Sequence, residues 1–163
     1  MTPELHRPIA LERIGPNGHD MTIEATAAEC AALAARMGLP AVLSLTCAFH
    51  LVRDDRTVLA RGHLVARVMQ TCVISLEDFE DTIEDRFRVR FVPSGEEEDN
   101  DDPDSDDEIP YEGHLIDLGE AAAEQLGLAL PPYPRMPGAE LPTAEEEEVR
   151  NPFAALAALK PKQ

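Results

Sequence analysis

The sequence has no tryptophan, and aromatic residues make up only 4% of its 163 residues. It contains no apolar run close to the roughly 18 residues that a membrane-spanning helix needs. The N-terminal stretch carries Glu4 and Glu12 and no apolar segment, so we expect no secretory signal. The cysteines are odd in number and widely spaced, at Cys30, Cys47 and Cys72. This count argues against a disulfide scaffold and predicts a protein of the reducing cytoplasm.

The patterns of catalytic and metal sites are also missing. The sequence has no phosphate-binding glycine loop, and its five histidines do not cluster at ligand spacing. Ser44 and Ser75 lie within strand-like patterns, not in the sharp turn of a nucleophile elbow. Carboxylates are so abundant that no pair of them stands out as general acid and base. We therefore expect a protein that is not an enzyme and needs no metal or cofactor.

Negative charge is abundant and is concentrated in two runs. The chain has 32 acidic and 14 basic residues, a formal net charge of −18. Residues 96–108 hold ten of the acids and residues 145–148 hold four, which leaves 18 acids against 14 basic residues in the rest. Segments of this composition cannot collapse into a core. They are either a solvated loop and linker, or a polyanion that competes with nucleic acid for a basic surface or shields a basic partner.

Alternating hydrophobicity and capping signals predict an α+β fold. We expect a curved antiparallel sheet or a partly closed β-barrel, with strands at 21–24, 43–51, 58–76, 79–92 and 109–116. Thr26 and Glu29 form a capping box for a helix over 27–37. Asp117 and Glu120 form the same signal for a second helix that ends at Pro131.

The domain boundaries follow from composition. We expect one domain over residues 1–130, interrupted by a mobile acidic loop at 94–108. Residues 131–150 hold five prolines and the second acidic run, and they read as a linker. Residues 151–163 predict a short amphipathic helix that either folds back on the domain or docks in a partner's groove. Its candidate partner-binding residues are Phe153, Leu156 and Leu159.

Basic side chains alternate along one predicted strand, at Arg86, Arg88 and Arg90. If this strand pairs with 58–76, Arg61, Arg67 and His63 extend the stripe into a patch. Arginines on a sheet face can contact phosphates through charge and forked donors. The alternative is that they are bound by acids nearby in sequence, namely Glu77, Asp78, Asp81, Glu84 and Asp85. The candidate RNA-binding residues are therefore Arg61, Arg67, Arg86, Arg88 and Arg90.

Three segments, in the same order along the chain, resemble the bacterial YceD family of large ribosomal RNA subunit accumulation proteins. The first segment is VMQTCVISLEDF at 68–79 with FRVRFVP at 87–93. The second is IDLGE at 116–120 with EQL at 124–126, LALP at 128–131 and YP at 133–134, and the third is NPFAAL at 151–156. The matching motif positions are Cys72, Leu76, Phe79, Asp117 and Glu120. We expect the first three to pack in the core and the last two to cap a helix.

The resemblance implies a role in the synthesis, processing or stability of 23S ribosomal RNA, with no known catalysis and no established cofactor. Many members carry Cys-x-x-Cys-Leu in the first motif, whereas here Cys72 is followed by Ser75 and Leu76. A thiolate pair cannot form at this position, so the zinc site that such a pair would suggest is not expected.

Three hypotheses of function remain open at this point. The first is a non-enzymatic factor in large ribosomal subunit biogenesis that binds 23S rRNA precursor through the arginine face. The second is the same role performed by escorting a basic large-subunit ribosomal protein with the acidic run. The third is an acidic adaptor that presents the C-terminal helix to a protein partner. None of them involves a membrane or a small-molecule substrate.

Overall fold

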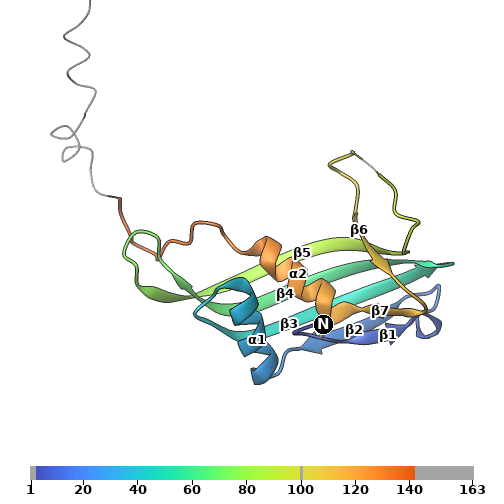
Figure 1. Ribbon diagram of the computed structural model, residues 1–163, viewed down its shortest axis with the longest axis horizontal. Helices are drawn as coiled ribbons and strands as arrows, with labels where there is room; N and C mark the ends of the chain where they lie inside the picture. The colour runs from blue at the N-terminus through green and yellow to red at the C-terminus, as the bar shows by residue number, and fades with distance from the viewer. Residues whose placement is uncertain (1–2, 100, 142–163) are drawn as a thin grey trace, which may run out of the picture.

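The computed structural model describes residues 3–99 and 101–141, and this part of the chain has an α+β fold (Figure 1). In chain order its elements are β1 (Pro8–Ala10), η1 (Leu11–Arg13), β2 (His19–Glu24), α1 (Ala27–Met37), β3 (Ala41–Asp54), β4 (Thr57–Thr71), β5 (Asp78–Pro93), β6 (Asp107–Tyr111), β7 (Leu115–Asp117) and α2 (Leu118–Ala129). The predicted fold class is confirmed.

The main sheet has five strands in the order β2-β3-β4-β5-β6, and β1 and β7 form a separate two-stranded sheet. The five-stranded sheet is open, so the alternative of a partly closed barrel is not what the structure shows. Strands β2 to β5 are antiparallel, as predicted, but β6 runs parallel to β5. The difference arises because residues 94–106 carry the chain back along β5 before β6 begins.

One face of the sheet carries the core. Ala60, Leu64, Ala66 and Val68 of β4 are fully buried, as their alternation predicts. Helix α1 packs against β3, and α2 packs against β4 and β5. Both helices lie on this face (Figure 1). The opposite face, called the outer face below, is left with the polar residues of the same strands.

Three predicted strands differ from those observed. The strand expected at 58–76 ends at Thr71, because residues 72–77 form the turn to β5. The other two differ in register or continuity. A β-bulge between Val42 and Ser44 shifts the register of β3, so Val42 is buried and Leu43 is 45% exposed. The expected strand at 109–116 is split into β6 and β7 by a turn in which Gly113 has φ +70°. Strict alternation could not reveal either break, since both depend on local backbone geometry.

Both helices begin at the predicted residues. Thr26 and Glu29 form the capping box of α1. The Asp117 carboxylate accepts the backbone N–H groups of Gly119 and Glu120 at the start of α2. The capping role expected for Glu120 is wrong, because its carboxylate binds Arg36 of α1 at 2.9 Å instead. This ion pair links the two helices.

Residues 142–163 lie outside the described part of the chain, which includes most of the predicted linker and all of the tail with Phe153, Leu156 and Leu159. The expected role of that tail therefore stays a prediction. Among the described residues, no helix is long and apolar enough to cross a membrane.

Candidate nucleic-acid interface

The strand register brings basic residues together on the outer face. Arg61 of β4 lies directly opposite Arg88 of β5, and His63 lies opposite Arg86. On the other side of β4, Arg61 is also opposite His50 of β3. Like charges directly opposite one another destabilise a sheet. The pairing of Arg61 with Arg88 is therefore costly to the sheet unless negative charge lies nearby.

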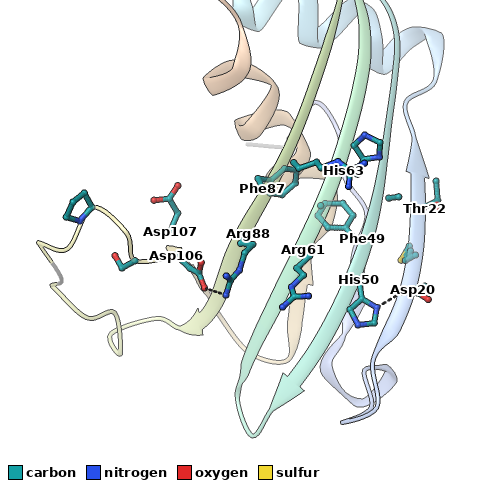
Figure 2. A pocket seen from close by; sticks show the side chains of 16 residues that line it. Asp20, Thr22, Phe49, His50, Arg61, His63, Phe87, Arg88, Asp106 and Asp107 are labelled. Carbon is teal, nitrogen blue, oxygen red and sulfur yellow. Dashed lines mark hydrogen bonds and ion pairs between the residues drawn. The ribbon is translucent and has the colours of Figure 1, made fainter.

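An open groove of about 830 Å³ lies over these residues. Figure 2 shows the Arg61, Arg88, His50 and Asp20 side chains on neighbouring strands, with Asp106 beside Arg88. One wall comes from the acidic segment, through Pro103, Ser105, Asp106 and Asp107. The groove is therefore basic along β4 and β5 and acidic where this segment borders it.

Several basic residues of the outer face are already paired with carboxylates. Arg88 binds Asp106 at 3.2 Å, and Arg90 binds Glu108 at 3.3 Å. The predicted alternative placed the partners of these arginines nearby in sequence, but both partners come from the acidic run. Mobility, which we expected of this run, is not confirmed, because its described residues make specific contacts with β5.

Arg61 and Arg86 differ from their neighbours. Both are exposed, and within residues 3–99 and 101–141 neither has an ion pair or a hydrogen-bonded partner. The histidines beside them do have acidic partners: His63 contacts Glu84 at 2.6 Å, and His50 contacts Asp20 at 2.5 Å. Two guanidinium groups are thus free to receive an anion in the groove.

The predicted arginine patch is only partly assembled. Arg61, Arg86 and Arg88 line the groove, but Arg67 and Arg90 do not. Arg67 lies closer to the β4–β5 turn and binds Glu80 at 2.5 Å. All five remain candidate RNA-binding residues from the sequence, and the geometry favours the three in the groove.

His50 is one of the groove residues that the sequence prediction missed. It alternates outward in β3 and faces Arg61 because the hairpin turn sets Asp54 opposite Thr57. Counting back from that turn would have identified the pair. Asp106 could not be found this way, since its contact with Arg88 joins residues outside any predicted hairpin.

A second feature is the β4–β5 turn, which contains the first sequence motif. The Cys72 sulfur accepts the backbone N–H of Ser75 at 3.5 Å and that of Met136 at 3.3 Å. The backbone N–H of Val73 donates to the carbonyl of Pro134 at 3.0 Å. Hydrogen bonds at Cys72 and Val73 therefore hold the chain that follows α2 against this turn. As a result, the first two motif segments lie side by side.

Hydrogen bonds to sulfur change the acidity of Cys72. The Ser75 hydroxyl and the two backbone N–H groups lower the pKa of the Cys72 thiol from 9.0 to about 7. Burial acts in the opposite direction at Cys47 and raises the pKa of that thiol to about 12. Among the described residues, no three His, Cys, Asp or Glu side chains are grouped to hold a metal ion.

The expected packing of the motif residues is confirmed only in part. Cys72 is fully buried and Phe79 is half-buried, but Leu76 is 77% exposed and has φ +62°. The packing interpretation of Leu76 is wrong because the turn that lets residues 75 and 77 approach Cys72 directs residue 76 outward.

A comparison with known families identifies this chain. The family model described as "Large ribosomal RNA subunit accumulation protein YceD" matches residues 60–160, more than half of the chain. The chain belongs to the YceD family. No curated protein and no solved structure matches it.

The YceD match begins within β4 and covers the turn at Cys72, the acidic segment and α2. Arg61, Arg86 and Arg88 fall inside it, whereas His50 and Asp20 precede it. The family description links YceD proteins to the accumulation of large-subunit ribosomal RNA.

Proposed function

We propose that this YceD protein supports large ribosomal subunit biogenesis by binding 23S rRNA precursor in the groove on the outer face, without catalysing a reaction. The observation that carries the proposal is the pair Arg61 and Arg86. Both are exposed, both lack a carboxylate partner within the described residues, and both lie beside Arg88. The family description supports the same class of partner.

The chemistry of the groove favours contacts with the phosphate backbone. An arginine guanidinium donates two parallel hydrogen bonds to a phosphate, and its charge is permanent. Phe49 and Phe87 also border the groove, but their rings pack edge to face against each other, Phe49 is 2% exposed and Phe87 is half-buried, so bases find little aromatic surface to stack on. Contacts of this kind fix position along an RNA chain and read little sequence.

The test is a charge reversal at the two unpaired arginines, Arg61→Glu with Arg86→Glu, measured as affinity for a fluorescently labelled fragment of 23S rRNA precursor. The matched control is Arg13→Glu with Arg135→Glu. These two arginines are also exposed and unpaired within the described residues, but they lie outside the groove. We expect the groove variant to lose at least about tenfold in affinity, since reversal removes two phosphate contacts and adds repulsion.

Two outcomes would refute the groove as the RNA site. One is equal affinity of the groove variant and the parent protein. The other is an equal loss in both variants, since that would report the net charge of the molecule and not a particular surface.

The acidic run supports a second candidate, the escort of a basic ribosomal protein. Asp99, Asp101 and Asp104 are exposed, and their carboxylates have no basic partner in the described chain. Changing these three to asparagine should reduce capture of basic large-subunit proteins in a pull-down. Undiminished capture would remove this candidate and leave the groove proposal intact.

A further inference from the structure

The acidic run lies along the same face as the arginines. Glu96 binds Arg56 in the β3–β4 turn at 3.1 Å. At the other end of the run, Asp106 and Glu108 bind Arg88 and Arg90 of β5 at 3.2 and 3.3 Å. Three separate ion pairs therefore hold this segment against basic residues on neighbouring parts of the sheet.

The contacts with β5 are the better protected ones. The side chains of Asp106 and Glu108 are only 20% and 14% exposed, whereas that of Glu96 is 59% exposed. Glu108 also accepts the backbone N–H of Glu98 at 2.8 Å, and β6 pairs with β5 along Asp107–Tyr111. Solvent screens such pairs less than it screens fully exposed ones.

We propose that the acidic segment is a built-in competitor for RNA. Asp106 and Glu108 hold the guanidinium groups of Arg88, in the groove, and Arg90, next to it on β5, in the place of phosphate groups, and an RNA chain that binds in the groove and extends along β5 displaces them. This inference rests on the proposed function and adds its regulation. Carboxylate and phosphate compete directly, because both bind the same fork of donors.

The groove geometry explains how displacement starts. Arg61 and Arg86 have no partner in the described chain, so a phosphate can bind them first. Arg88 lies directly opposite Arg61, which brings the next phosphate close to the Arg88–Asp106 pair. An RNA that makes only one or two contacts stays on the free arginines. An RNA that makes several contacts displaces the carboxylates from Arg88 and Arg90.

The competition lowers the apparent affinity for RNA. When only a fraction of molecules has Arg88 and Arg90 free, the measured affinity is reduced by that fraction. The segment is attached to β5, so its effective concentration at the arginines is high whatever the concentration of protein. The protein would thereby reject short or sparse polyanions and retain long RNA.

The decisive experiment neutralises the two contacting acids, Asp106→Asn with Glu108→Gln, and measures affinity for a labelled single-stranded RNA of 23S precursor sequence. The control is Asp99→Asn with Asp101→Asn, which changes the net charge equally in the same segment. We expect the contact variant to bind about five- to tenfold more tightly than the parent protein, because two arginines become available. The control should change affinity less than about twofold, through long-range charge alone.

The salt dependence gives a second readout. Each additional phosphate contact with single-stranded nucleic acid steepens the slope of log affinity against log salt by about 0.7. The contact variant should therefore have a slope steeper by about 1.4, for two added contacts, whereas the control should keep the parent slope. Asp106→Asn alone leaves the Arg90–Glu108 pair and β6 in place, and it should give a smaller gain in the same direction.

The outcomes separate the two proposals. If the parent protein binds RNA and the contact variant gains no more than the control, the competitor role is refuted and RNA binding stands. If none of the proteins binds RNA, the proposed function fails and the competitor role fails with it. A tighter and more salt-sensitive contact variant supports both.

Discussion

Gly119, in the first turn of α2, touches the N-terminal segment. A Cβ atom there would lie 2.6 Å from the Leu5 carbonyl oxygen and 2.9 Å from the Arg7 nitrogen, and backbone cannot move aside cheaply. We predict that Gly119→Ala lowers the free energy of unfolding by about 2 kcal/mol in chemical denaturation. Gly127→Ala is the control in the same helix. It has open space around it, so it should raise stability by about 0.5–1 kcal/mol. Equal effects would contradict this packing.

Cys72 gives a prediction about pH. Its thiol has a pKa of about 7, whereas that of Cys47 is raised to about 12 and that of Cys30 is also raised. Ultraviolet absorbance should therefore report one thiolate forming with a midpoint near pH 7. Ser75→Ala removes the hydroxyl donor and should move this midpoint upward, and Cys72→Ala should abolish it. A Ser75→Ala midpoint equal to that of the parent protein would contradict the assigned hydrogen bond.

The sign of the effect on stability follows. The pKa of Cys72 is lower in the folded protein than the ordinary 9.0 of an unfolded chain. The thiolate therefore stabilises the fold fully above about pH 9, and this contribution is lost as the pH falls through about 7. Relative to Cys72→Ala, the parent protein should gain stability between these values in urea titrations. A constant difference between the two proteins across this range would count against the lowered pKa.

The roles of single residues differ in how far they could be predicted from the sequence. Thr26 and Asp117 were predictable as caps, because capping uses contacts within one turn. The contact of Cys72 with Met136 was not predictable, since it depends on where the chain packs after α2. The exposure of Leu76 depends on the β4–β5 turn around Cys72, and it was missed for the same reason.

At the scale of elements, Asp117 joins a helix to a strand. One carboxylate oxygen accepts the N–H groups of Gly119 at 3.0 Å and Arg7 at 2.8 Å, and the other contacts His6 at 2.6 Å. Thr26 caps only its own helix. We predict that Asp117→Ala costs about 2 kcal/mol of stability and Thr26→Ala about 1 kcal/mol, from the spread of N-cap substitutions. Thermal unfolding of both variants would check this, and a larger loss in Thr26→Ala would contradict it.

The faces of the long strands were predictable and the edges of the sheet were not. Period-two alternation placed Ala60 and Leu64 on the core face and Arg61 on the other, as observed. The parallel pairing of β6 with β5 sets Arg88 and Arg90 beside Asp106 and Glu108, which lie beyond the acidic loop in sequence. No local pattern encodes such pairs, so the sequence could not tell which arginines are free.

At the scale of the whole molecule, the net charge of −18 and the proposal of RNA binding are compatible. Charges separated by more than about 8 Å are largely screened at physiological salt, so an RNA chain in the groove responds mainly to local side chains. The acidic composition correctly points to a polyanionic segment. It does not show that this segment lies on the basic surface, which only the strand register and the ion pairs reveal.

The most direct test of the account is made in cells that lack this gene, by sucrose-gradient profiles of their ribosomal subunits. The parent protein should restore the large-subunit peak and 23S rRNA. Arg61→Glu with Arg86→Glu should fail to restore them, whereas Arg13→Glu with Arg135→Glu should succeed. Full restoration by the groove variant, at equal protein levels, would contradict the claim that this protein acts through RNA bound on its outer face.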